Sequence, residues 1–169
     1  PLSAVVSPWL GRDGKPALAA VLGITQATRS GEATPELTAR LTAVDELGRN
    51  RGESAIRLRV KPKPGSTGDM HYEVLAQLPA QPGRYEVRVG ASLGSRVGTV
   101  QVPVDVPDFA NARLAASGLV LSATPAPRFA PKDGLAGLTP VTPTTRREFA
   151  PVDAVVAMLR VYQKGVRDA

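Results

Sequence analysis

The fold is decided by residues 78–90, which read Leu78-Pro79-Ala80-Gln81-Pro82-Gly83-Arg84-Tyr85-Glu86-Val87-Arg88-Val89-Gly90. A Pro-Gly turn follows an apolar residue and opens into a strand where Tyr85 and two valines alternate with charged residues. A tyrosine at such a corner of a β-sandwich packs inward and bonds its hydroxyl to nearby backbone. We therefore expect Tyr85, with Pro82 and Gly83 in the turn before it, to be structural residues at the start of a penultimate strand.

Period-two alternation marks several other runs as strands. Ile56 and Leu58 point one way while Arg57 and Arg59 point the other, which is typical of strands buried on one face. Gly- and Pro-rich turns separate the runs. The expected strands are Leu2–Leu10, Ala17–Gln26, Leu37–Asp45, Ala55–Lys61, Met70–Leu78, Tyr85–Ser92 and Val97–Val106. This pattern predicts an all-β fold, an immunoglobulin-like or fibronectin III-like antiparallel sandwich of about seven strands over residues 1–108.

The rest of the chain has a different character. Thr124–Pro151 holds prolines at positions 125, 127, 131, 140, 143 and 151, and proline favours extended backbone around it. We expect 109–151 to be an extended Pro-rich linker outside any core, in which Ser117–Ala123 could add one extended run. The apolar run Val155–Gln163 is interpreted as a strand, with a helix as the alternative, because periodicity cannot separate the two in so short a run. Residues 152–169 would then be the first strand of an incomplete second sandwich.

Composition narrows the class of protein. Only one Trp, three Tyr and three Phe are present, so any core must be aliphatic. The absence of cysteine excludes disulfides, thiolate nucleophiles and Cys-ligated zinc. The net charge of +6 is spread along the chain, which favours solubility over nucleic-acid binding. No apolar run approaches the roughly 20 residues of a membrane helix, and because the chain opens on Pro1 we expect a piece of a longer protein.

One strand carries a candidate metal site. Asp69, His71 and Glu73 alternate along it and share a face, and two carboxylates with an imidazole could ligate a metal ion. The preferred alternative is a solvated polar face opposite Met70 and Tyr72, because one strand alone supplies poor ligand geometry. We expect no metal and no cofactor.

A basic stretch is the second candidate site. Its members are Arg49, Arg51, Arg57, Arg59, Lys61 and Lys63. They could bind a polyanion or acidic lipid, but the preferred interpretation is a solvent face whose charges protect a sheet edge. No aromatic residues interleave with them, which argues against single-stranded nucleic acid. Arg57, Arg59 and Lys61 remain candidate interaction residues.

Catalytic motifs are lacking. A Ser-His-acid triad would have to use His71, the single histidine, yet no Gly-x-Ser-x-Gly elbow is present. Neither a Gly-x-Gly-x-x-Gly nor a Gly-Lys-Ser/Thr phosphate loop occurs. We therefore expect no enzyme activity. Trp9 could be a binding aromatic, but a lone tryptophan at a strand end more often caps a core.

Several motifs in one order resemble a known family. They are Pro82-Gly83-Arg84-Tyr85-Glu86-Val87-Arg88-Val89, Gly98-Thr99-Val100, Val104-Asp105-Val106-Pro107-Asp108-Phe109, Ser117-Gly118-Leu119-Val120-Leu121-Ser122 and Thr144-Thr145-Arg146-Arg147-Glu148-Phe149. Over roughly residues 70–165 the chain resembles the C-terminal sandwich region of bacterial von Willebrand factor type A-like (VWFA-related) domain-containing proteins. The resemblance implies an exported protein, extracellular or periplasmic, with an adhesive or structural role and no catalytic residues here. It also implies that Val161-Tyr162 helps to open a second sandwich.

Two functions therefore stay open. The first is a structural or protein-interaction module that binds a protein partner or a neighbouring domain of the same polypeptide through loops or strand edges. The second is a carbohydrate-binding or enzyme-appended accessory sandwich. We expect the apolar segment with Val155, Met158 and Tyr162 to dock by strand addition or packing onto a sandwich, its own or a neighbour's, and self-association through residues 152–169 is an option. Nucleic-acid binding and membrane insertion are not expected.

Overall fold

The computed structural model describes residues 1–28, 36–59 and 68–164, and every regular element within them is a β-strand. The strands are β1 (Leu2–Leu10), β2 (Pro16–Thr28), β3 (Glu36–Asp45), β4 (Asn50–Arg59), β5 (Gly68–Pro79), β6 (Gly83–Leu93), β7 (Arg96–Val106), β8 (Leu114–Ala116), β9 (Val120–Thr124), β10 (Arg128–Ala130), β11 (Ala154–Met158) and β12 (Val161–Gln163). The first seven correspond to the strands expected from sequence, with shifts at their ends. The largest shift is in β4, which begins at Asn50 instead of Ala55, and the expected end of this strand at Lys61 lies outside the described residues.

The first seven strands form a two-sheet sandwich. Strands β1, β2 and β5 make one sheet and β4, β3, β6 and β7 make the other, all paired antiparallel. The short strand β10 extends the first sheet by pairing with β5 in parallel. The predicted all-β antiparallel sandwich of about seven strands is therefore confirmed.

Aliphatic side chains fill the space between the two sheets, as the composition predicts. The largest of them with almost no exposed surface are Leu18, Leu22, Leu37, Leu41, Leu78 and Val87. They come from β2, β3, β5 and β6, so each central strand contributes its inward-facing residues. Burial of such side chains supplies most of the stabilisation of a small domain.

Tyr85 closes one end of this core as the turn motif predicts. Its ring is 7% exposed, and its hydroxyl donates to the Gln81 carbonyl at 3.0 Å and accepts from the Gln81 amide at 3.2 Å. Gly83 between them has a φ of 141°, which L-residues with a side chain rarely adopt. The turn and the tyrosine thus form one unit that fixes where β6 begins.

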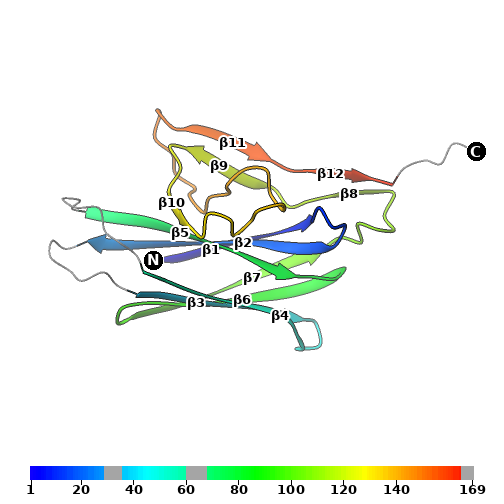
Figure 1. Cartoon of the computed structure of the whole chain (residues 1–169), viewed down its shortest axis with the longest axis horizontal. Coiled ribbons are helices and arrows are strands. Elements are labelled where there is room, and N and C mark those ends of the chain that lie inside the picture. The colour runs from blue at the N-terminus through cyan, green and yellow to red at the C-terminus, as the bar shows by residue number, and fades with distance from the viewer. Residues whose placement is uncertain (29–35, 60–67, 165–169) are drawn as a thin grey trace, which may run out of the picture.

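The segment after β7, residues 107–164, covers the outer face of the β1-β2-β5 sheet and adds a third layer (Figure 1). We call it the covering segment. Leu135 and Leu138 are buried there against Trp9 and Leu75 in a second core. The expectation that this segment lies outside any core is therefore wrong. Proline prevents regular strand pairing, but it does not prevent side chains between the prolines from packing.

Strand β2 shows why this third layer is needed. Leu18 and Leu22 point into the sandwich, whereas Ala19 and Val21 point into the second core. A strand buried on both faces has a continuous apolar sequence rather than an alternating one, and Ala17–Ile24 has that form. Leaving the outer face of β2 uncovered would expose this apolar surface to water.

The outermost ribbon of the molecule pairs segments that are far apart in sequence. Strand β11 pairs antiparallel with β9 and β12 pairs antiparallel with β8, and Figure 1 shows this ribbon as the layer farthest from β3 and β6. The interpretation of 155–163 as strand rather than helix is confirmed. The expected strand addition also occurs, onto β8 and β9 of the same chain instead of onto an edge of the sandwich.

Candidate functional site

The candidate interaction site is the outer edge of β11 and β12. Met158 pairs with Val120 on β9, and Val161 pairs with Ala116 on β8, so both strands use the same side of the backbone. Within the described residues no strand pairs with the other side. A free edge of this kind presents backbone donors and acceptors that can accept another strand.

Apolar side chains line this edge on both of its faces. Val155 and Val156 are 43% and 54% exposed, and as neighbours in a strand they point to opposite faces. Leu159 and Val161 continue the exposed apolar surface along the strand. Exposed apolar residues that gather in one place, rather than singly, mark interaction surfaces.

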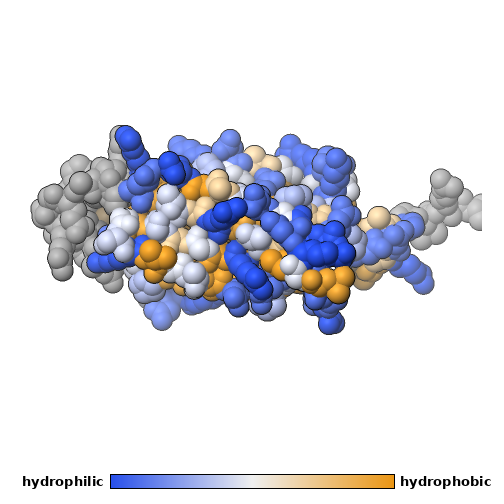
Figure 2. Space-filling view, turned by 90° about the horizontal axis from the view of Figure 1, so that it is seen from below, coloured by the Kyte–Doolittle hydropathy of each residue, from blue (hydrophilic) through white to orange (hydrophobic). Residues whose placement is uncertain are grey.

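The face on the opposite side of the molecule is mostly hydrophilic, unlike the β11–β12 edge. Figure 2 views the face formed by β3, β4, β6 and β7, where hydrophilic residues predominate and apolar residues form small separate groups. Arg57 and Arg59 on β4 are exposed, as predicted. Arg57 lies 3.4 Å from the Glu36 carboxylate and Arg40 lies 3.0 Å from Glu53. These surface pairs contribute little stability and make this face charged but mixed in sign.

The basic stretch is partly neutralised by Asp45. Arg49 and Arg51 both donate to its Oδ2, at 2.9 and 2.7 Å. Partial burial would raise the pKa of Asp45, but hydrogen bonds from Arg49, Arg51 and Leu47 hold this pKa well below its usual range. Arg49, Arg51 and Arg57 are therefore held in ion pairs, whereas Arg59 is exposed without an ion pair to a described residue. Lys61 and Lys63 lie outside the described residues.

Met158 and Tyr162 hold the ribbon to the rest of the chain. Met158 is partly buried against the second core. The Tyr162 ring packs edge-on against Phe109 with centroids 4.9 Å apart, and its hydroxyl accepts a hydrogen bond from the Leu10 amide at 3.1 Å. Of the three apolar candidates expected on the interaction surface, Val155 is therefore exposed, while Met158 and Tyr162 act as anchors.

Trp9 is part of the same attachment. Its side chain is fully buried in the second core, and its indole nitrogen donates to Ser7 Oγ at 2.9 Å. The guanidinium carbon of Arg160 lies 5.9 Å from the ring centroid, within reach of a cation–π contact. The interpretation of Trp9 as a core residue is confirmed.

A buried carboxylate fastens the covering segment to β5. Glu73 is 1% exposed, and its Oε1 accepts from Thr144 Oγ1 at 2.6 Å and from the Thr145 amide at 2.7 Å. The Thr145 hydroxyl also donates to Oε1, at 3.2 Å. Three donors from residues more than 70 positions away thus converge on one oxygen. We call Glu73, His71, Thr144 and Thr145 the anchor cluster.

His71 links this cluster to β2. Its Nε2 lies 3.3 Å from Glu73 Oε1, and its Nδ1 lies 3.0 Å from Thr25 Oγ1. Burial alone would raise the pKa of Glu73, but the hydrogen bonds from His71, Thr144 and Thr145 outweigh it and hold this pKa below its ordinary value. Glu73 is therefore an ionised carboxylate inside the protein, stabilised by donors that belong to the covering segment.

Gly23 on β2 permits the close approach of Thr145. A Cβ atom at this position would overlap the Thr145 hydroxyl and would lie 2.6 Å from Ser3 Oγ. Glycine inside a strand often marks a place where another part of the backbone comes close. Gly23 and the Thr144-Thr145 pair were the sequence signals for the anchor cluster that the strand-by-strand interpretation missed.

The geometry corrects the earlier interpretation of this strand. Glu73 does not lie on a solvated polar face, because the covering segment buries it and donates hydrogen bonds to it. Within the part of the chain that the structure describes, no group of three or more His, Cys, Asp or Glu residues is placed to hold a metal ion. The side chain of Asp69 lies outside that part.

No protein-family model, curated protein or solved structure matches this chain. Function must therefore be inferred from the surfaces themselves. All seven aromatic residues lie in the described part of the chain, and each is buried or partly buried. No helix within that part is long and apolar enough to cross a membrane. The free β11–β12 edge is the surface with the plainest capacity to bind.

Proposed function

We propose that this chain is a non-enzymatic structural and protein-interaction module of an exported bacterial surface protein. Its binding surface is the free β11–β12 edge, and its partner is a neighbouring β-sandwich domain of the same polypeptide. The observation that carries the proposal is a strand edge with which no described strand pairs and which has exposed valines on both faces. Main-chain pairing along such an edge, with side chains packed on either face, is the usual mode of strand addition.

The way the edge is held supports this role. Strand β11 is already extended and paired with β9, and Thr144 and Thr145 are fixed upstream by Glu73. A partner therefore does not have to order a flexible segment, which lowers the entropic cost of binding. The module can in this way set the direction in which the chain leaves it.

The exported character of the protein is supported by the sequence resemblance to VWFA-related proteins, in which Val161 and Tyr162 would help to open a second sandwich. The competing function, a carbohydrate-binding accessory domain, has weaker support. Sugar-binding sandwiches stack their ligands on exposed aromatic rings, and the aromatic side chains here are at most partly exposed.

Self-association of the 169-residue chain tests the free edge directly. Without the partner domain, two edges should pair with one another at high protein concentration, and sedimentation velocity over a range of concentrations measures this. Replacing Val155 and Val156 with lysine should abolish the association, because charged residues prevent edge pairing. Leu47→Lys, at an exposed apolar residue in a turn, is the matched control and should associate like the wild type.

Two results would contradict the proposal. One is a chain that stays monomeric at every concentration and shows no protection of β11 and β12 amides when a partner-domain fragment is added. The other is association that persists unchanged in the double lysine variant, since the contact would then lie elsewhere.

A further inference from the structure

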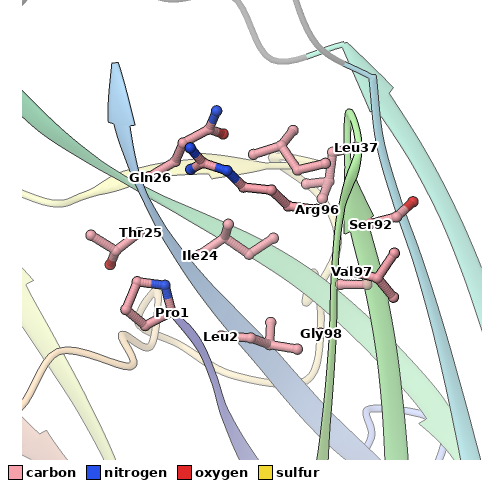
Figure 3. Close-up of a pocket in the computed structure, with 12 residues that line it drawn as sticks. Pro1, Leu2, Ile24, Thr25, Gln26, Leu37, Ser92, Arg96, Val97 and Gly98 are labelled. Atoms are coloured by element: carbon pink, nitrogen blue, oxygen red, sulfur yellow. The ribbon is translucent and has the colours of Figure 1, made fainter. Parts of the chain in front are cut away.

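The sandwich is open at the end opposite Tyr85. A cavity of about 600 Å³ lies there between the two sheets, where the cross-strand pairs Leu2–Ile24 and Leu37–Leu93 come together. Figure 3 shows Leu2, Ile24 and Leu37 around the cavity, with Ile24 near its centre. The volume is within the range of about 300–1,000 Å³ that is typical of small-molecule sites.

Small side chains explain why this end is not filled. Ala91 on β6 faces Gly98 on β7 directly, and both line the cavity. At the other end Tyr85 and Phe109 complete the core, whereas no aromatic residue lines the cavity. The core therefore tapers from large aromatic rings at one end to a hollow with aliphatic walls at the other.

Two polar side chains occupy inward-facing positions at the mouth of the cavity. On β7, Arg96 lies on the same side of the strand as Gly98 and Val100, which face the other sheet. On β2, Gln26 lies on the same side as Ile24. In the view of Figure 3 the guanidinium of Arg96 extends from β7 toward Gln26. In the described part of the chain neither side chain has a hydrogen-bond or ion-pair partner.

Arg96 is exposed to solvent at the mouth of the cavity, so its charge needs no partner within the protein and stays available to a ligand. Of the other arginines in this sheet, Arg40, Arg57, Arg84 and Arg88 each lie within 4.0 Å of a carboxylate, whereas the exposed Arg59 on β4 forms no ion pair with a described residue. Arg96 combines a guanidinium that no described residue pairs with and a place at the mouth of the cavity of about 600 Å³. A guanidinium is the side chain best suited to bind a carboxylate through two parallel hydrogen bonds.

We propose that this cavity binds a small amphipathic carboxylate. The aliphatic body of the ligand lies between Ile24, Leu37 and Leu93, and its carboxylate pairs with the Arg96 guanidinium. The amide of Gln26 is a second donor to the same carboxylate. This site is separate from the β11–β12 edge and does not depend on the function proposed for that edge.

The competing explanation is that Arg96 protects the edge strand β7. Inward-pointing charges on edge strands prevent unwanted pairing with other sheets. That explanation requires no ligand, and it predicts that loss of the charge promotes aggregation rather than a change in binding. The two explanations therefore differ in what a binding measurement will show.

Titration calorimetry with decanoate and with 1-decanol distinguishes carboxylate binding by Arg96 from protection of the β7 edge. Decanoate should bind saturably at one site per chain. Arg96→Gln should weaken decanoate binding about tenfold, the low end of the effect of a charge-assisted hydrogen bond, and should leave decanol binding unchanged. Arg57→Gln, at an exposed arginine on the outer face of β4, is the matched control and should bind both probes like the wild type.

Ala91→Phe tests the cavity itself. A phenyl ring at this position should occupy the hollow and abolish binding of both probes, with thermal unfolding used to confirm that the variant folds. Chemical shifts of the Ile24 and Leu37 methyl groups on addition of decanoate locate the ligand independently of any variant. The proposal is overturned if decanoate does not saturate, if Arg96→Gln and Arg57→Gln bind it equally, or if only vesicles of anionic phospholipid bind.

Discussion

Replacing Glu73 with Gln should weaken the attachment of the covering segment to β5. The amide keeps the size of the carboxylate and retains one oxygen, so Thr144 and Thr145 can still donate to it. Those hydrogen bonds lose their charge-assisted character, which costs about 1 kcal/mol for each of the two short ones. The new NH₂ group takes the place of Glu73 Oε2, which has no partner within the described residues, and a buried unsatisfied donor costs about 1–3 kcal/mol.

Removing the charge also has a favourable effect, because a buried ion no longer has to be desolvated. The net loss expected for Glu73→Gln is therefore about 2–3 kcal/mol in the free energy of unfolding, a large fraction of the stability of a small domain. Urea titration followed by tryptophan fluorescence measures it, since Trp9 lies in the core that the covering segment closes. Glu86→Gln, at an exposed acid paired with Arg88, is the control and should cost less than about 0.5 kcal/mol.

Hydrogen exchange shows where that free energy is lost. In Glu73→Gln the amides of Thr145, β9 and β11 should exchange faster, whereas those of β3 and β6 in the other sheet should be unchanged. Local opening of this kind is expected when one layer of a fold is weakened. A variant as stable as the wild type, with unchanged exchange at Thr145, would refute the view that Glu73 fastens the covering segment.

The same cluster predicts how stability depends on pH. The pKa of Glu73 is lower in the folded state, so its contribution is fully present above the pKa of an unfolded glutamate, about 4.3. It is lost as the pH falls through the lower folded pKa. Asp153 titrates in the same direction, because hydrogen bonds from the Ala150 amide and Arg146 lower its pKa. The difference in the free energy of unfolding between wild type and Glu73→Gln should therefore shrink in acid. This difference separates the contribution of Glu73 from that of Asp153.

Four further variants test three separate parts of the fold. Tyr85→Phe should cost about 1 kcal/mol for the lost hydroxyl bonds and Tyr85→Ala about 3–5 kcal/mol, and a Tyr85→Ala variant as stable as wild type in denaturant would remove the corner assignment. Gly23→Ala should cost about 1–3 kcal/mol by displacing Thr145, and unchanged exchange at the Thr145 amide would contradict the close approach inferred here. Replacing Arg57 and Arg59 with Gln should change the free energy of unfolding by less than about 0.5 kcal/mol each; failure of this variant to fold would mean that β4 has another register.

The sandwich could be predicted from sequence because its strands obey a simple rule. In β3, β4 and β7 apolar and polar residues alternate, and in each case the apolar set faces the other sheet. The turn before Tyr85 added a specific geometric constraint. Alternation is a local signal, so a strand can be recognised without knowing its neighbours.

The third layer could not be predicted in the same way because it depends on contacts distant in sequence. The prolines of 125–151 indicated an extended segment but carried no information about what it packs against. Two signals were present nevertheless: the continuous apolar run of β2, which implies cover on both faces, and Gly23 within that run, which implies a close approach. Neither signal identifies Thr144 and Thr145 as the groups that supply the cover.

Glu73 and Arg96 differ in how far the protein itself satisfies their charge. Glu73 is buried, and its Oε1 accepts hydrogen bonds from both threonines of the covering segment, so its charge is used to hold the fold together. Arg96 is exposed at the mouth of the cavity between the sheets, and no carboxylate of the described chain pairs with it. A charge whose partners come from the protein itself is structural, whereas a charge kept at an apolar cavity without a partner is available to an external anion. Glu73 therefore belongs to the stability of the fold, whereas the binding role proposed for Arg96 depends on whether Arg96→Gln binds decanoate more weakly than Arg57→Gln does.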